Sequence, residues 1–502
     1  MHFLKTIFPA FILFVTSVSL VAQNWRQQVD YQIDVRLDDQ TNSVQARQRV
    51  KYTNSSPDTL RYIYFHLAWH GRKASVSSKY NIFAVQQNGV AIDFDIIDSR
   101  EDDAVAPQSM SQSLLEIKLS RPLLPGDADT YTIAWQADIP VFSGGAGRNA
   151  PSGVDYVFLH WYPQACVYDR LGWHLGSPYE PDYSGEFGSY KVEITLPQKY
   201  MVAGTGVLAN ADNIGYGYEN SGGTVKPNYG LISVWKFQAD QVNDFGWAAD
   251  PDFKHQKKQV RNGLILHSFA LNNEHQLEDI ESELGNFEQR FLSYHYPQLS
   301  VVEAGELRAE FPMIVFSSKS SMPDLTPVIS WDFQNNLLKN NYLLKQFIYA
   351  AGDDAFRKGL AQILPRYRFG SPSAEESIHI LERASGYELD WLWEQYSNTR
   401  TQADYAIKTV KSAGENAVSI ELERIRGTVL PIVLQVTFAD STTKTWYIPT
   451  ELQRTHEKEV WNSGQKTYQF KLNHPFETIR KIEIDPEHLS GDVDVSNNIK
   501  TF

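Results

Sequence analysis

The side chains of this sequence that could hold a metal ion are its 13 histidines, 60 acidic residues and one cysteine. Metal-assisted hydrolysis needs two neutral imidazoles on one helical face, a third ligand, and a glutamate that takes a proton from the metal-bound water. The motif HExxH supplies both imidazoles and that glutamate within about one helical turn. Neither HExxH nor its inverse HxxEH occurs, so the spacing predicts no such centre.

Two weaker pairs of possible metal ligands remain, and each contains a histidine. His66 and His70 are four apart at the end of a strand-like run. Positions four apart on a strand share a face but lie about 13 Å from each other, too far for one metal ion. His275 and Glu278 are three apart on a predicted helix, and we interpret them as a solvated face. Neither pair is predicted to bind a metal.

The segment between His160 and His174 is rich in aromatic residues. Both histidines could line a cleft, but the sequence pairs them with nothing. Cys166 lies between them and is the only cysteine, which excludes an intrachain disulfide and a cysteine zinc cluster. We interpret it as a small buried hydrophobe. Nucleophile elbows and phosphate loops are absent, and Gly204-Thr205-Gly206 is interpreted as a turn.

The elements that must position these residues begin with strands. Apolar and polar residues alternate over Tyr31–Leu37 and again over Tyr190–Leu196. A period of two places one face of a strand on a core and the other in water. Turn-forming Gly, Pro, Asn and Asp clusters separate such runs. We therefore predict a large antiparallel β domain over residues 24–270.

A helical pattern replaces the strands after this region. Apolar residues recur every three or four positions at Leu277, Ile280, Leu284, Phe287 and Phe291. A second helix is predicted over Trp331–Ala351, with Gly352 as its C-terminal cap. Ser373 and Glu376 form a capping box for a later helix. We predict a helical domain over residues 271–402.

The last hundred residues return to a period of two. Val418, Ile420 and Leu422 alternate with other residues, as do Ile432, Leu434 and Val436. This pattern predicts a C-terminal β-sandwich over residues 403–502.

The first residues are typical of a secretory signal peptide. Lys5 precedes the nearly all-apolar run Ile7–Val21, and a cleavage site is predicted after Ala22 or Gln23, which makes residues 1–23 the signal. No other stretch is long and apolar enough to span a bilayer once the signal is removed. The net charge of −14 argues against a nucleic-acid partner. We expect an exported protein, periplasmic or extracellular.

Longer segments carry a resemblance over nearly the whole mature chain. They are LRYIYFHL (60–67), HWYPQACVYDRLGWH (160–174), GEFGSYKVEITLPQKYMVAGTG (185–206), WKFQADQVNDFGWAADPDF (235–253), YHYPQLSVVEAGELRAEFPMIVF (294–316), FRKGLAQILPRYRFGSPSAEESIHILERASGYELDWLWEQY (356–396), LPIVLQVTFADSTTKTWYIP (430–449) and IRKIEIDPEHLSGDVDVSNN (479–498). Together they resemble the alanyl aminopeptidase family of zinc metallopeptidases, the gluzincins, in the form of its secreted bacterial members. The resemblance implies a multidomain α+β protein with a large antiparallel β domain, a truncated thermolysin-like helical domain and a C-terminal β-sandwich.

The part of the family pattern that holds zinc is missing. The family carries HExxH, an 18-residue spacer and a glutamate ligand, 24 positions that belong between the AEFPM strand and the next shared helix. Only 14 positions, residues 317–330, separate Phe316 from Trp331. The family's transition-state tyrosine is also absent from Trp331–Asn336, and Tyr342 comes too late. We therefore predict no cofactor here, since zinc is expected only in complete members, and we expect the loss to expose apolar surface.

One binding residue of the family has a counterpart. A Gly-x-Met-Glu strand edge binds the substrate's free amine through its glutamate, and the matching segment here is GELRAEFPM (305–313). By position Glu310 is the amine anchor, with Ala309 in place of methionine and the glycine displaced to Gly305. The alternative is that Glu310 is an exposed strand carboxylate.

Three functions stay open at this point. The first is a non-catalytic relative that still binds a peptide or protein. The second is a shortened or mis-assembled copy of an active zinc aminopeptidase. The third is a structural or adhesive β module, in which Trp161, Trp173 and Trp391 form a binding surface instead of packing in a core.

Overall fold

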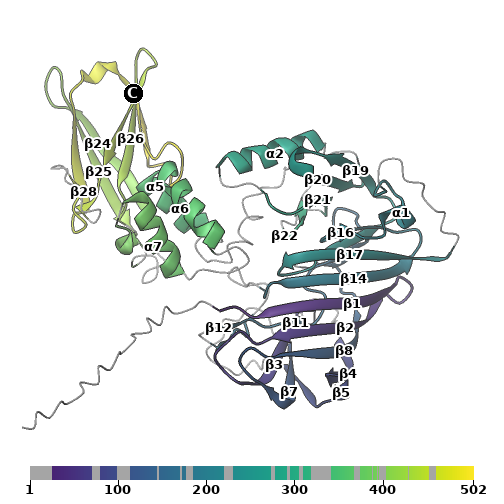
Figure 1. Cartoon of the computed structure of the whole chain (residues 1–502). Helices are drawn as coiled ribbons and strands as arrows, with labels where there is room; N and C mark the ends of the chain where they lie inside the picture. Colours follow the sequence, from purple (N-terminus) through teal and green to yellow (C-terminus); the bar gives the residue numbers. More distant parts are fainter. Residues whose placement is uncertain are drawn as a thin grey trace, which may run out of the picture.

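The structure is a computed structural model that is built mainly of strands (Figure 1). The residues that it describes are 25–69, 80–98, 113–143, 146–169, 172–176, 185–219, 230–272, 277–290, 294–304, 309–317, 341–366, 374–386, 388–392, 394, 403–427, 429–451 and 460–502. The predicted signal, residues 1–23, lies outside these ranges, as do His70, His275, Phe291, Ser373 and Gly305.

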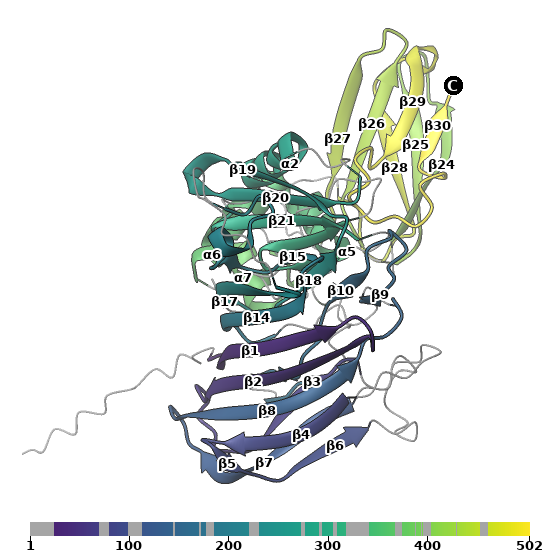
Figure 2. The ribbon, with the colours of Figure 1, turned by 90° about the vertical axis from the view of Figure 1, so that its right-hand side faces the viewer.

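An eight-stranded sheet dominates the N-terminal part, and its long strands lie side by side in both views (Figures 1 and 2). In spatial order the strands are β16 (Val207–Leu208), β17 (Ile232–Val242), β14 (Gly188–Pro197), β1 (Gln28–Asp38), β2 (Ser43–Thr53), β8 (Ala128–Asp138), β4 (Tyr80–Gln87) and β5 (Val90–Ala91). The alternation predicted for β1 and β14 is confirmed, because their apolar residues are buried. The β1–β14 pair is parallel, unlike the other pairs of this sheet, and the long stretch of chain between the two strands leaves room for the crossover that a parallel pair needs.

Two smaller sheets and a short hairpin complete this part. The sheets are β11 (Gln164–Ala165), β3 (Leu60–Leu67), β7 (Ser113–Leu123) and β6 (Phe94–Asp98), and β15 (Met201–Gly204), β18 (Trp247–Asp250), β10 (Tyr156–Phe158) and β9 (Gly147–Arg148). The hairpin pairs β12 (Tyr168–Asp169) with β13 (Gly172–Trp173). Fully buried aromatic residues fill the core. Cys166 is buried as predicted, and burial raises the pKa of its thiol.

A five-stranded mixed sheet follows. Its order is β19 (Lys254–Gln259), β20 (Ile265–Ala270), β21 (Gln298–Glu303), β23 (Ile314–Ser317) and β22 (Ala309–Phe311). Helix α2 (Leu277–Arg290) buries Leu277, Ile280 and Leu284, three residues of the predicted apolar stripe. β22 is the edge strand and pairs antiparallel with β23. The sheet joins strands from both sides of position 270.

Three further helices lie beside the C-terminal strands (Figure 1). They are α5 (Asn341–Ala351), α6 (Asp353–Arg366) and α7 (Ala374–Ser385). Gly352 ends α5 as predicted, with a φ of 86° and its N–H donating to Ile348 O at 2.8 Å. None of the described helices has the length and apolar character needed to cross a membrane.

The C-terminal part consists of two packed sheets, as predicted. They are β24 (Asp404–Ser412), β25 (Val418–Arg426) and β28 (Thr467–Leu472), and β27 (Thr443–Ile448), β26 (Ile432–Phe438), β29 (Ile479–Ile484) and β30 (Ile499–Thr501). Helix α5 is tied to the second sheet by two tyrosines. Tyr349 Oη accepts from Val433 N at 2.9 Å, and Tyr447 Oη donates to Ala350 O at 2.9 Å.

Candidate functional site

The predicted amine anchor lies on an edge strand. Glu310 is the middle residue of β22, opposite Val315 of β23, and the sheet order places no described strand on the other side of β22. The structure describes the backbone of Glu310 but not its side chain, and Gly305 is outside the described residues. The role predicted for either residue therefore stays a prediction.

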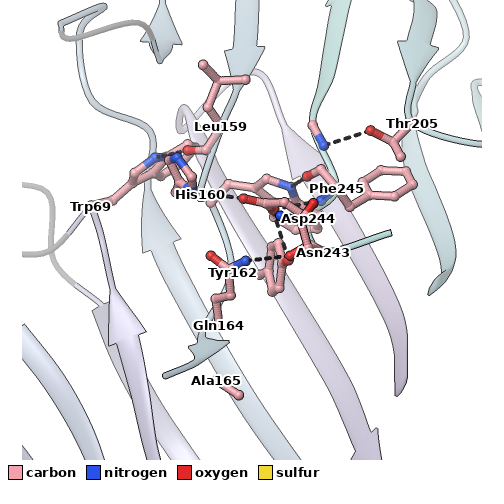
Figure 3. A network of polar contacts seen from close by, with 12 residues as sticks. Trp69, Leu159, His160, Tyr162, Gln164, Ala165, Thr205, Asn243, Asp244 and Phe245 are labelled. Atoms are coloured by element: carbon pink, nitrogen blue, oxygen red, sulfur yellow. Dashed lines mark hydrogen bonds and ion pairs between the residues drawn. The ribbon is translucent and has the colours of Figure 1, made fainter. Parts of the chain in front are cut away.

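Strand β22 reaches the large β region at His160. The ring centroids of His160 and Phe311, the neighbour of Glu310, are 5.2 Å apart. His160 Nδ1 lies 2.8 Å from Asp244 Oδ2, and the two side chains are 15% and 7% exposed (Figure 3). The sequence showed no partner for His160, and the structure places Asp244 beside it. The partner lies far along the chain, so spacing could not show it.

The other carboxylate oxygen of Asp244, Oδ1, accepts two hydrogen bonds that fix the side chain. Asp244 Oδ1 accepts from Tyr162 Oη at 2.9 Å and from Phe245 N at 2.6 Å. Tyr162 Oη also lies 3.0 Å from Tyr190 Oη. Because these bonds fix the carboxylate, its second oxygen faces the imidazole, an arrangement that sets the orientation of a histidine ring.

His160 has an unusual backbone. Its φ is +47°, in the left-handed region that residues with a side chain adopt rarely. Such a conformation costs about 1–3 kcal/mol and persists where surrounding contacts determine it. The turn after β10 therefore directs the His160 side chain to Asp244 through a backbone conformation that is itself unfavourable.

Side-chain to backbone hydrogen bonds join the two segments that carry this pair (Figure 3). Trp161 Nε1 donates to Phe245 O at 2.9 Å, and Gln164 Nε2 donates to Asn243 O at 3.0 Å. Gln164 Oε1 and Asn243 Oδ1 are buried and find no hydrogen-bond partner among the described residues. Two acceptors thus lie unsatisfied beside the His160–Asp244 pair, where a polar ligand group or a buried water can donate to them.

A second histidine lies in the same region. His66 is opposite Gln164 in the β3–β11 pairing. Burial, and then the nearby His160, lowers the pKa of His66 to about 3. His66 is therefore neutral at physiological pH. The predicted separation of His66 from His70 stays a prediction, because His70 lies outside the described residues.

His174 also has a partner that the sequence did not show. Its Nε2 lies 2.9 Å from Asp169 Oδ1, on the strand opposite β13. That hydrogen bond raises the pKa of His174. Glu186 is fully buried nearby, and burial raises the pKa of its carboxyl to about 7, although Arg26 opposes the shift. Both predicted loop histidines are thus oriented by aspartates.

The aromatic residues considered for an adhesive surface are packed. Trp161 is fully buried and Trp391 is 8% exposed. Trp173 is half-buried, with its ring centroid 4.9 Å from that of Tyr168. A binding surface made of these three side chains is therefore not formed.

Comparison with solved structures identifies the fold. The chain resembles the M1 zinc metallopeptidase of Deinococcus radiodurans, with a TM-score of 0.50, 11% identity, and coverage of 75% of this chain and 94% of that one. A mutant of that enzyme bound to a Tyr-Ser-Ala substrate matches with a TM-score of 0.50 and 13% identity, and the match covers 75% of this chain and 95% of that one. No family model and no curated protein matches the chain. At this identity the likeness shows a shared fold.

The residues that the structure describes beside β22 do not bring three metal-ligand atoms together. Among the described residues, only His379, Glu382 and Asp390 bring three ligand atoms within 4.8 Å of one another. They lie on α7 and just after it. His160, by contrast, has its Nδ1 turned to a carboxylate.

Proposed function

We propose that this chain is an exported, non-hydrolytic relative of the M1 zinc metallopeptidases that binds peptides along the edge strand β22. The observation that carries the proposal is the length of the segment between Phe316 and Trp331. It has 14 positions, whereas the zinc motif of the resembling family occupies 24. Without the cation there is no activated water and no Lewis acid, so peptide hydrolysis loses its main source of rate.

The binding mode follows from the position of β22. An extended peptide can add to a free sheet edge through backbone hydrogen bonds, while side chains beside the edge give specificity. Glu310 is the proposed partner of the peptide's free amine, since a carboxylate pairs with an ammonium. Phe311 follows Glu310 on the strand, and its ring contacts His160, so this end of β22 offers an aromatic surface to a bound peptide.

A peptide titration tests this proposal. A peptide with a free N-terminus is titrated calorimetrically into the mature chain, and its N-acetylated form serves as the ligand control. Glu310→Gln is expected to weaken binding of the free peptide about 10- to 100-fold, because a charge-assisted hydrogen bond contributes about 1.5–3 kcal/mol. Glu415→Gln, an exposed carboxylate in a distant turn, should leave binding unchanged. Equal affinities for both peptides and all variants would contradict the proposal.

A shortened copy of an active enzyme is the second candidate. Its support is that the shortened segment lies between β23 and α5, inside the helical region and not at a boundary between regions. Coding DNA from several independent isolates decides between them. An uninterrupted frame across residues 317–330 in all isolates favours the non-hydrolytic relative, and restored HExxH codons in any isolate favour the shortened copy.

Export is tested separately. The proposal expects the N-terminus of the mature protein to lie at Gln23 or Asn24. N-terminal sequencing of protein recovered outside the cytoplasm measures this directly. An intact Met1 on the recovered protein would count against a cleaved signal.

A further inference from the structure

A cluster outside the β22 site has the composition of a metal site. His379 and Glu382 are three apart on α7, so they share one helical face. Asp390 comes from the segment after the helix, and ligand atoms of all three lie within 4.8 Å of one another. The cluster unites one imidazole nitrogen with two carboxylates, a ligand set that suits Zn²⁺ and related divalent transition metals.

The chain positions the third ligand by folding back on α7. Gly386, at a φ of 74°, ends the helix, and its N–H donates to Glu382 O at 2.7 Å. Leu389 and Trp391 are then buried, while Asp390 between them is exposed. The burial of its two neighbours holds the Asp390 backbone against the end of α7.

Glu382 is fixed by the same turn. Its Oε1 accepts from Leu389 N at 2.6 Å and from Asp390 N at 3.1 Å. Its Oε2 lies 3.0 Å from His379 Nδ1. Two ligand atoms at about 2.1 Å from a tetrahedral zinc ion lie about 3.4 Å apart, so a small outward movement places a cation between them.

We propose that His379, Glu382 and Asp390 bind one divalent transition-metal cation, best matched by Zn²⁺. The two carboxylates give the site a charge of opposite sign to the ion. The alternative is an ordinary helical ion pair between His379 and Glu382, to which Asp390 contributes nothing. The proposal is independent of peptide binding at β22, so either can fail alone.

The test uses untagged mature chain from which metal has been removed by a chelator. Zn²⁺ is titrated calorimetrically, and Co²⁺ binding is followed by visible absorption. One equivalent is expected to bind, and His379→Asn and Asp390→Asn should each weaken binding at least about 100-fold, since changes outside the ligand shell alone cost about 10- to 100-fold. His488→Asn is the matched control, because His488 is also exposed and asparagine tolerates its φ of 55°.

Thermal unfolding supplies an independent readout. Zinc should raise the midpoint of the wild type and of His488→Asn but not that of the two ligand variants. If His379→Asn does not fold, Asp390→Asn, which alters an exposed side chain, decides alone. No saturable one-equivalent binding, or equal binding in Asp390→Asn, would overturn the site.

Discussion

The β region (residues 24–270) and the helical region (residues 271–402) differ in how their functional residues are held. In the β region, His160 and Asp244 come from distant segments that buried aromatic side chains and hydrogen bonds join tightly. In the helical region, the helix that would carry zinc in the resembling family has no room in the sequence. The proposed peptide-binding strand β22 and the missing zinc segment thus both fall in the helical region, and β22 reaches the β region through the contact of Phe311 with His160.

The described core of the helical region is closed. No described residue between Leu264 and Arg424 is an exposed large hydrophobic side chain. The expectation of exposed apolar surface is therefore not met in the part of this region that the structure describes. Phe347, Phe356 and Leu381 instead pack in one cluster that also includes the C-terminal sheets. The remaining helices gain their cover from the C-terminal part.

The largest predicted effect is a loss of stability in the β region. Trp161→Ala removes a fully buried ring and its hydrogen bond to Phe245 O, so we expect a loss of about 3–5 kcal/mol in the free energy of unfolding. Peptide binding should weaken with it, because the same ring supports the His160 segment. Chemical denaturation measures the loss. Trp173→Ala, at a half-buried site, is the control, and an equal loss there would show that burial at Trp161 is not the cause.

A pair of glycines tests how tightly the helical region is packed. A Cβ on Gly359 of α6 would clash with Leu381 Cδ2 of α7, and Leu381 is fully buried. Gly359→Ala should therefore destabilise the protein by about 1–3 kcal/mol. Gly285→Ala in α2 meets only Arg261 at 3.9 Å and should stabilise it by up to about 1 kcal/mol through helix propensity. Thermal unfolding of both variants measures the two effects. Midpoint shifts of the same sign would contradict this contrast.

A dependence of stability on pH is expected from buried groups of the β region. The pKa of His66 is lowered to about 3 and that of His255 to about 4, mainly by burial. Both histidines take up a proton below about pH 6.5 in the unfolded chain but stay neutral in the folded one. Their contribution to stability therefore falls as the pH falls from about 6.5 toward these values. Each histidine contributes up to about 1.4 kcal/mol per pH unit. Glu186, with its pKa raised to about 7, acts in the opposite direction between pH 4.5 and 7.

Urea denaturation between pH 5 and 7 isolates the contribution of one histidine. His66→Leu should flatten the dependence of unfolding free energy on pH relative to the wild type, and Glu186→Gln should steepen it. If His66→Leu leaves the slope unchanged, His66 does not resist protonation in the folded protein.

Local patterns predicted the elements that depend on neighbouring residues. Alternation gave β1 and β14, the apolar spacing gave α2, and Gly352 gave the end of α5. These features need only the period of a strand or helix and the conformational freedom of glycine. The parallel register of β1 on β14 depends on which distant strands meet, and no single segment encodes that.

The candidate site shows the same division. Asp244 follows the strand β17 in an Asn-Asp-Phe-Gly turn, which marks it as a loop carboxylate but not as the partner of His160. His379 and Glu382 have a visible i, i+3 spacing, whereas Asp390 joins them only because the chain reverses at Gly386. Spacing along the chain identifies ligands on one helix and misses those that a turn brings back.

Hydrolysis of an alanyl-nitroanilide by the purified mature chain tests the central proposal most directly. It is measured as prepared, after treatment with a chelator, and after addition of zinc, because metal bound at His379 would mislead a simple zinc analysis. We predict no turnover above the rate without protein under any of these conditions. Turnover that the chelator abolishes and zinc restores would contradict the proposal that this chain binds peptides without cleaving them.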